Sequence, residues 1–189
     1  MQFVENIKQK LGDFFFKREL KANPRQREVH NLHTAKSIGI LYDATEREDM
    51  LKVSEFVNVL FQTKKDVKAL GFVNLKELTH HHMPMLQFDF FFLKDLNWFY
   101  KPENYIIKNF VEKDYDILIN LCDSTCIPIK YLAGSSQAKF KVGKYEEHID
   151  LYDMMIDVKE NTLSALIKEI HHYLTCLLYT SPSPRDTMS

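Results

Sequence analysis

The stretch Y-D-I-L-I-N-L-C-D at residues 115–123 constrains the fold more than any other part of the chain. Its centre is an almost unbroken apolar run, which follows a charged stretch and ends on polar residues. A short apolar run without alternation is typical of a strand in a parallel sheet that helices cover on both faces. We therefore predict that residues 115–123 form the central strand of an open parallel sheet.

The rest of the chain alternates between strand-like and helix-like patterns. Strands are predicted at 37–43, 67–73, 87–93, 138–142 and 151–158, and helices at 45–63, 102–112, 128–134 and 163–174. Thr45 and Glu48 have the spacing of a capping box. Pro102 and Pro128 suit first helical turns, and Asn161 suits the cap of the last helix. We predict a three-layer, Rossmann-like α/β fold with an open, mostly parallel sheet of strand order near 3-2-1-4-5.

Three segments are expected along the chain. Residues 1–33 form an N-terminal amphipathic helix with a connector, residues 34–174 form a single α/β domain, and residues 175–189 form a tail. The tail, T-C-L-L-Y-T-S-P-S-P-R-D-T-M-S, breaks the helical period and resembles translated adaptor sequence. We therefore leave it out of the fold prediction.

The predicted N-terminal helix, residues 2–20, has an apolar stripe and a basic charge balance. The stripe consists of Val4, Ile7, Leu11, Phe14 and Phe15, at helical spacing. Residues 1–30 carry seven basic and four acidic side chains. A basic amphipathic helix can lie on an anionic membrane, so residues 2–21 are a candidate membrane-surface segment. The pattern favours the alternative, a helix packed on the domain with a solvated outer face.

Composition excludes several classes of protein. A net charge of −1 gives no electrostatic basis for binding nucleic acid. Three cysteines do not make the framework of a small secreted disulfide protein. No apolar stretch reaches the ~20 residues that span a bilayer, and the N-terminus lacks the features of a signal peptide. We expect a cytoplasmic protein whose partner is another protein or a small molecule.

Ligands of open α/β sheets bind beyond the carboxyl ends of the strands, where the strand order reverses. Near that point the candidate site residues are Asp43, Lys94, Asp95, Asp123, Ser124 and Thr125. Two carboxylates there could bind Mg²⁺ or act as acid and base, and a helix N-terminus could hold an anion. The alternative, which the pattern favours, is that each residue caps its own helix. A separation of roughly 4–8 Å between the Asp43 and Asp123 carboxylates would favour a shared site.

Motifs for nucleotides and for acyl transfer are absent from the sequence. The turn after residues 37–43 contains no glycine, and neither G-x-x-x-x-G-K-[ST] nor G-x-S-x-G occurs. Since a backbone can approach a phosphate closely only where glycines permit it, we predict no cofactor.

The run at residues 80–82 is the most conspicuous candidate for metal binding. In an extended loop only alternate residues, His80 and His82, can face one point. Cysteine or carboxylate ligands at tetrahedral spacing are missing, so the pattern favours a polar loop over a zinc site. Cys122 and Cys126 are spaced C-x3-C, and a helix N-terminus could make the Cys126 thiol reactive, although small buried cysteines are common.

Three stretches together carry a resemblance to a known family. They are S-I-G-I-L-Y-D-A at 37–44, K-D-L-N-W-F at 94–99, and D-I-L-I-N-L-C-D with Y-L-A-G-S-S-Q-A-K-F-K-V-G within 116–143. Over about residues 30–174 the chain resembles small bacterial proteins, typical of the Bacteroidetes group, that share a domain of unknown function. More loosely, the last stretch is similar to part of one half of heptosyltransferase-type glycosyltransferases. The first resemblance implies one cytoplasmic α/β domain and brings no activity, cofactor or site residues.

Three functional hypotheses remain at this point. The favoured one is a non-enzymatic binding or interaction module, which would need an exposed apolar patch such as Phe14–Phe16 or Trp98–Tyr100. The second is a small-molecule or transferase-like enzyme, which would need a pocket at the strand ends with converging carboxylates. The third is a peripheral membrane protein that uses residues 2–21.

Overall fold

The computed structural model describes residues 16, 25–76, 81–122, 125–147 and 151–177, and it confirms the predicted α/β fold. Six strands form one open, parallel sheet in the order β3-β2-β1-β4-β5-β6, which adds β6 to the predicted order. The strands are β1 (Ser37–Asp43), β2 (Asp66–Val73), β3 (Phe88–Phe92), β4 (Ile117–Asn120), β5 (Phe140–Lys144) and β6 (Met154–Ile156). The helices are α2 (Arg47–Gln62), α3 (Tyr105–Glu112), α4 (Ile127–Ser135) and α5 (Leu163–Cys176), with a short 3₁₀ turn, η1 (Leu93–Asp95).

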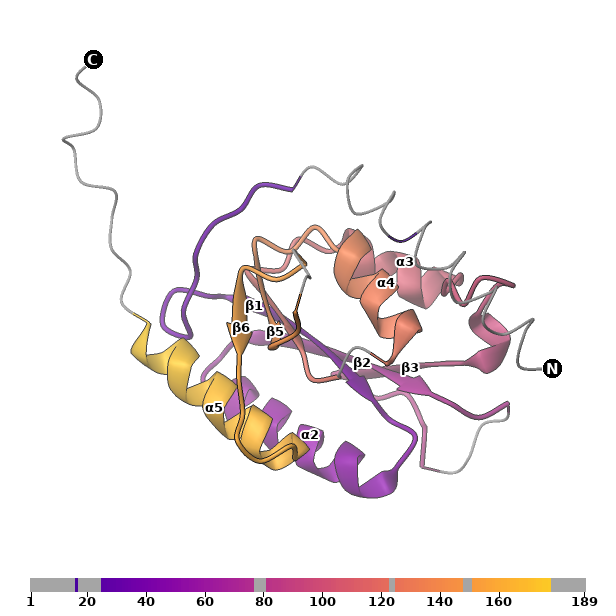
Figure 1. The fold of residues 1–189 in the computed structure, drawn as a ribbon, viewed down its shortest axis with the longest axis horizontal. Helices are drawn as coiled ribbons and strands as arrows, with labels where there is room; N and C mark the ends of the chain where they lie inside the picture. The colour runs from indigo at the N-terminus through magenta and orange to yellow at the C-terminus, as the bar shows by residue number, and fades with distance from the viewer. Residues whose placement is uncertain (1–15, 17–24, 77–80, 123–124, 148–150, 178–189) are drawn as a thin grey trace, which may run out of the picture.

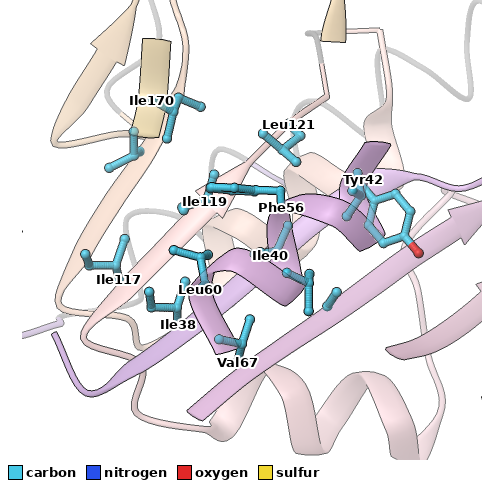
Figure 2. Close-up of a cluster of buried hydrophobic side chains, with 14 of the residues drawn as sticks. Ile38, Ile40, Tyr42, Phe56, Leu60, Val67, Ile117, Ile119, Leu121 and Ile170 are labelled. Atoms are coloured by element: carbon cyan, nitrogen blue, oxygen red, sulfur yellow. The ribbon is translucent and has the colours of Figure 1, made fainter. Parts of the chain in front are cut away.

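Helices cover both faces of the sheet, as the apolar strands require. Figure 1 shows α2 and α5 on one face and α3 and α4 on the other. Ile38 and Ile40 of β1 pack in the core on the first face, and Leu41 packs in the core on the second. In Figure 2 the first core includes Phe56 of α2 and Ile170 of α5. Successive side chains of a strand point to opposite faces of the sheet, so β1 packs against both helix layers. Burying each such side chain contributes roughly 1.5–3 kcal/mol to the stability of the fold.

The predicted central strand corresponds to β4, which lies between β1 and β5 and is buried throughout. It is shorter than predicted because the side chain of Asn120 takes part in a turn. Oδ1 of Asn120 accepts a hydrogen bond from the backbone N–H of Cys122 at 2.9 Å, and its Nδ2 lies 2.5 Å from the hydroxyl of Tyr152. The chain leaves the sheet here and continues toward α4.

The capping box predicted at Thr45 and Glu48 is wrong. Helix α2 begins at Arg47, with Glu46 at its N-cap, and no side chain bonds to its first turn. Oγ1 of Thr45 instead accepts a hydrogen bond from the backbone N–H of Asn74 at 2.9 Å. Thr45 therefore joins the chain after β1 to the chain after β2.

The predicted start of α3 at Pro102 is also wrong. The helix begins at Tyr105, and Asn104 caps it by accepting a hydrogen bond from the N–H of Ile107 at 2.8 Å. An asparagine at the N-cap satisfies an N–H group that would otherwise lack a partner, so the cap sets the start. Pro128 does lie in the first turn of α4, as predicted.

Helix α5 differs from the prediction at both ends. Thr162, not Asn161, is its N-cap, and Oγ1 of Thr162 accepts a hydrogen bond from the N–H of Ala165 at 3.2 Å. The helix ends at Cys176, two residues after the predicted end. Thr175 and Cys176, which the sequence analysis assigned to the tail, are therefore helical.

A polar network joins distant segments at the amino ends of the strands. The carboxylate of Asp116 accepts hydrogen bonds from the backbone N–H groups of Lys36 at 2.8 Å and Ser37 at 3.2 Å, and from Nζ of Lys139 at 2.9 Å. Burial alone would raise the pKa of Asp116, but these bonds outweigh it and lower the pKa to about 2. Asp116 thus holds the start of β4 against β1 and β5.

The connector before β1 is held to the domain by Arg25. Its Nη2 lies 2.7 Å from both carboxylate oxygens of Asp153, and its Nη1 donates to the carbonyl oxygens of Ala138 at 3.2 Å and Lys139 at 2.8 Å. The Arg25 side chain is almost fully buried. A bidentate, charge-assisted pair of this kind fixes the position of the connector on β5 and β6.

Only Phe16 of the predicted N-terminal helix lies among the described residues, and it is helical. Its ring meets the ring of Tyr131 of α4 edge-on, with the centroids 5.5 Å apart. The predicted stripe of Val4, Ile7, Leu11, Phe14 and Phe15 lies outside the described residues. Among the helices that the structure describes, none is long and apolar enough to cross a membrane.

Candidate functional site

A pocket of about 240 Å³ opens at the carboxyl ends of the strands, where the strand order reverses; we call it the crevice pocket. Its walls come from the ends of β1 and β2, the loop after β3, and the first turn of α4. Two of the predicted site residues, Asp43 and Thr125, line this pocket together. The further lining residues are Phe72, Asn74, Leu93, Leu96, Tyr100, Cys126, Ile127 and Pro128.

Asp43 is exposed at the end of β1 and combines a structural with a potential binding role. Oδ1 of Asp43 accepts a hydrogen bond from the backbone N–H of Thr45 at 2.8 Å, so this oxygen closes the turn after the strand. No described group bonds to Oδ2 of Asp43. Oδ1 of Asp43 therefore closes a turn and does not cap α2, whose N-cap is Glu46, and Oδ2 can accept a hydrogen bond from a ligand.

Lys94 and Asp95 do not line the crevice pocket. Oδ2 of Asp95 accepts a hydrogen bond from the N–H of Phe92 at 2.8 Å, which is the local capping role that the sequence allowed. The ammonium of Lys94 lies 5.7 Å from the centroid of the Phe92 ring. Asp123 and Ser124 lie outside the described residues, so the expected approach of Asp43 to Asp123 stays a prediction.

The loop after β3 is organised by Asn97, which the sequence analysis did not single out as a site residue. Oδ1 of Asn97 accepts hydrogen bonds from the N–H groups of Phe99 at 2.9 Å and Lys101 at 3.1 Å. Between them, Tyr100 adopts a φ of +61° and lines the crevice pocket. A bulky residue in this left-handed region is strained, and such strain concentrates at ligand sites. The sequence signal for this loop was an asparagine followed by aromatic residues in a polar stretch.

The metal hypothesis for His82 does not match its surroundings. His82 is buried, not part of a polar surface loop, and its ring lies 5.4 Å from that of Phe90. Its Nε2 lies 2.8 Å from the carbonyl oxygen of Ala44, so this nitrogen carries a proton and donates. His80 lies outside the described residues. In the part of the chain that the structure describes, no three His, Cys, Asp or Glu residues group closely enough to hold a metal ion.

A second hollow, of about 490 Å³, runs along the outer edge of the sheet between β2, β3 and one face of α3; we call it the edge groove. Three of its residues are large and exposed: Leu86 at 82%, Tyr105 at 74% and Phe61 at 50%. Its charged residues pair with one another, Lys68 with Asp89 at 2.8 Å and Lys113 with Asp66 at 2.7 Å. The groove therefore offers mainly apolar contacts. This surface was not predicted from the sequence.

Lys141 of β5 is fully buried and was also missed. Its ammonium group donates to the carbonyl oxygen of Ala133 at 2.6 Å and lies 3.3 Å from that of Gly134, in the last turn of α4. Burial, and to a smaller extent the charge of Arg25, lower the pKa of Lys141 to about 7. Lys141 thus caps a helix C-terminus, where a positive charge is favourable. The sequence signal for this buried residue was a lysine inside the apolar strand pattern at 138–142.

Comparison with known proteins identifies a family but no characterised relative. Neither the curated proteins nor the solved structures contain a match to the chain. The model of a family of unknown function, DUF6913, matches residues 8–177, and residues 178–189 of the predicted tail fall outside that match. Because the match extends over most of the sequence, the chain belongs to the DUF6913 family of proteins of unknown function.

Proposed function

We propose that this protein is a binding module that takes a small molecule into the crevice pocket. The observation that carries the proposal is the position of this pocket at the reversal of strand order, where it brings together Asp43, Asn74 and Thr125 from three separate segments. Its volume of about 240 Å³ is below the ~300–1,000 Å³ of pockets for drug-sized ligands, so the ligand is small.

The lining determines the chemistry of the ligand. Oδ2 of Asp43 accepts hydrogen bonds, which favours an amine or a hydroxyl group and disfavours an anion. Phe72, Leu93 and Leu96 supply an apolar wall for the body of the molecule. Pro128 in the first turn of α4 has no N–H group, which weakens the case for a phosphate at this helix.

Binding is preferred to catalysis because of what surrounds Asp43. Among the described lining residues, Asp43 is the single carboxylate, and one of its oxygens closes a turn. A reaction that uses a pair of carboxylates as acid and base would need a second carboxylate at this point. The bacterial and cytoplasmic setting is part of the same proposal, supported by the family resemblance and by the lack of disulfides among the described cysteines.

Amide NMR spectra with three simple probes test the proposal. Benzylamine, benzyl alcohol and benzoate share one ring and differ in the charge of the attached group. We expect benzylamine to bind best and to shift the amide signals of Asn74, Leu96 and Tyr100, and benzoate to leave them unchanged. Replacing Asp43→Asn should weaken benzylamine binding roughly tenfold while affecting benzyl alcohol less, because only the amine loses an ion pair.

Asp157→Asn provides the matched control, since it removes an exposed carboxylate outside the crevice pocket. It should leave benzylamine binding unchanged. Equal weakening by both substitutions, or stronger binding of benzoate than of benzylamine, would contradict the proposal.

The edge groove supports a second candidate function, the docking of an apolar segment of a partner protein. Exposed apolar side chains gathered in one groove and rimmed by charges are typical of protein interaction sites. The backbone of β3 is less accessible to a partner strand here. The N–H of Met85 donates to the carbonyl oxygen of Phe88 at 2.9 Å, and the N–H of Phe88 donates to the carbonyl oxygen of Met85 at 3.1 Å. Peptides selected from a random displayed library should bind the wild type, bind weakly to Leu86→Asp and bind normally to Leu51→Asp, an exposed site outside the groove.

A further inference from the structure

The side chain of Tyr115 carries a buried hydroxyl group beside the edge groove. Tyr115 lines the groove and is fully buried, and none of the described residues bonds to its hydroxyl oxygen. The ring passes over β1 at Gly39, where a Cβ would lie 3.0 Å from Cδ2 and Cε2 of the ring. The side chain therefore extends from the residues before β4 toward β2 and β3, which form the floor of the groove. Because buried hydroxyl groups in proteins usually have a partner, this one is available to a ligand in the groove.

The carboxylates of Asp66 and Asp89 place negative charge near this hydroxyl group. Burial, and to a smaller extent these two charges, raise the pKa of Tyr115 above its usual value. The hydroxyl group therefore stays protonated and acts as a hydrogen-bond donor. Asp66 pairs with Lys113 at 2.7 Å and Asp89 with Lys68 at 2.8 Å, but a carboxylate can accept several hydrogen bonds. The floor of the groove thus combines one O–H donor with two carboxylate acceptors.

An exposed ion pair lies over the Tyr115 ring. Nζ of Lys113 is 5.1 Å from the centroid of this ring and 2.7 Å from Oδ2 of Asp66. The two charged side chains are 37% and 64% exposed. Exposed pairs of this kind contribute little to stability, because water screens them and the paired side chains lose conformational freedom. A ligand can therefore displace the Lys113 side chain at little cost and reach the hydroxyl group.

The outer edge of β3 is closed to a further strand. In the parallel pairing with β2, the backbone groups of Phe88, Phe90 and Phe92 point to the outer edge. The N–H of Phe88 already donates to the carbonyl oxygen of Met85 at 3.1 Å, and the N–H of Phe92 donates to Oδ2 of Asp95 at 2.8 Å. A partner segment must then use its side chains and satisfy its own backbone hydrogen bonds. An α-helix meets both conditions.

The groove has room for such a helix beside α3. Tyr105, Asn109 and Lys113 line it at intervals of four residues, so one side of α3 forms a wall. Leu86 and Phe61 add exposed apolar contacts. A partner helix can pack against this wall and over β2 and β3, on the face of the sheet that α3 and α4 cover (Figure 1).

The polar groups of the floor determine which side chain of the partner can reach Tyr115. A carboxylate would be repelled by Asp66 and Asp89, and an ammonium group has no acceptor for the O–H of Tyr115. The amide of glutamine or asparagine has both functions: its oxygen accepts from Tyr115, and its NH₂ group donates to a neighbouring carboxylate.

We propose that the edge groove binds an amphipathic helix of a partner protein, whose glutamine or asparagine side chain bonds to the Tyr115 hydroxyl while apolar side chains contact Leu86, Tyr105 and Phe61. The inference rests on the second candidate function, the docking of a partner segment in this groove. It adds the conformation of that segment and the side chain at its centre. It does not depend on a ligand in the crevice pocket.

Peptide selection on the full chain tests this inference. The probes are peptides displayed on a helix-forming framework and randomised along one face. Binders that lose affinity for Leu86→Asp are the ones that occupy the groove. Among these binders we expect glutamine or asparagine to be enriched at one position, with apolar residues three or four positions away.

Tyr115→Phe removes only the hydroxyl group, so thermal unfolding should not change, whereas a selected peptide should bind roughly tenfold more weakly. Tyr42→Phe is the matched control, because Tyr42 is also buried, no described group bonds to its hydroxyl, and it lies outside the groove. This control should leave peptide binding unchanged.

Changes in the peptide test the same hydrogen bond on the wild-type protein. Replacing the enriched amide residue by leucine should weaken binding to the wild type roughly tenfold and binding to Tyr115→Phe much less, because the bond is already lost there. Replacing it by glutamate should weaken binding to the wild type further, since Asp66 and Asp89 repel a carboxylate.

Several results would overturn the inference and leave docking at the groove intact. They are groove binders without an amide residue, equal losses with Tyr115→Phe and Tyr42→Phe, and binders that tolerate proline at the centre of the framework, since proline breaks a helix. A wild-type dimer that Leu86→Asp converts to monomers would also overturn it, because a second copy would then occupy the groove. A library without any binder sensitive to Leu86→Asp would contradict the second candidate function itself.

Discussion

The two ends of the sheet differ in how their polar side chains are used. At the amino ends, hydrogen bonds join residues far apart in the sequence: Asp116 bonds to Lys36, 80 residues away, and Arg25 bonds to Asp153, 128 residues away. At the carboxyl ends the two described carboxylates act locally. Asp43 bonds two residues ahead, and Asp95 bonds three residues back.

This difference separates stability from binding. Long-range charged bonds bring segments together and make the amino ends a fixed base for the sheet. Local bonds shape a single turn or loop and leave the space between loops open, as the crevice pocket shows. Asp43 lies at the end of the sheet where the rule for α/β folds predicts ligand sites, whereas Asp95 lies outside the crevice pocket and Asp123 lies outside the described residues. The two described carboxylates, Asp43 and Asp95, take part in local turns, and Oδ2 of Asp43 has no described partner.

The largest expected effect concerns Lys141 at the fixed end. Its pKa is near 7 in the folded protein and near 10.5 unfolded, so between these values the unfolded chain binds more protons and stability rises with pH. From pH 7 to 9.5 we expect a gain of about 3 kcal/mol in the free energy of unfolding. Urea unfolding should show this rise in the wild type and in Lys144→Met, an accessible control on the same strand. Lys141→Met should give a flat profile, and a rise as large as that of the wild type would contradict the assigned burial.

Carboxylates from the two ends give a direct contrast. Asp116→Asn should lower the free energy of unfolding by about 2–3 kcal/mol, because Lys139 loses its partner beside a largely buried group. Asp43→Asn should cost less than about 1 kcal/mol, because the amide oxygen can still cap the turn. The Asp116 contribution is present above the unfolded pKa and should disappear as the pH falls from about 4 to about 2. Equal losses for the two variants in urea unfolding would remove the distinction between the ends.

Asn97→Ala sharpens the comparison within the carboxyl end. The substitution leaves the N–H groups of Phe99 and Lys101 without their shared acceptor, so we expect a loss of about 1 kcal/mol in stability. Its effect on benzylamine affinity should be larger, roughly tenfold, because the loop that carries Tyr100 is no longer held in place. Calorimetry and thermal unfolding measure the two effects. An unchanged affinity would show that the loop does not shape the pocket.

The smallest effects are expected at two residues with positive φ, Lys64 and Tyr100, each at 61°. Glycine adopts this conformation without strain, so Lys64→Gly in the turn after α2 should stabilise the protein by up to about 1 kcal/mol. Tyr100→Gly relieves the same strain but removes a wall of the crevice pocket. We expect benzylamine binding to weaken for Tyr100→Gly alone. Loss of binding with Lys64→Gly would mean that the two ends are coupled.

Sequence patterns predicted the layers and the sheet order because each depends on a local signal. The apolar run at 115–123 predicted a central strand. Successive apolar side chains of β1 pack in the cores on opposite faces of the sheet, because helices cover both faces. Helix starts were less predictable because several polar residues compete for each cap. Thr45, for example, bonds to Asn74, a partner that becomes available only once β2 lies beside β1.

The site was predicted in part for the same reason. Asp43 and Thr125, two of the predicted residues, line one pocket because the strand order brings their segments together. The shape of the loop around Asn97, the exposed surface of the edge groove and the burial of Lys141 depend on contacts between distant segments. Such contacts leave little trace in a single sequence.

Native-state hydrogen exchange, with and without benzylamine, tests the division between the two ends most directly. The amides of Ser37 and Phe140 at the amino ends should exchange only through global unfolding, at the same rate in both samples. Amides in the loop from Leu96 to Lys101 should exchange faster through local opening and slow down when benzylamine is added. Equal rates at the two ends, or a loop that benzylamine leaves unprotected, would contradict the assignment of stability to one end and binding to the other.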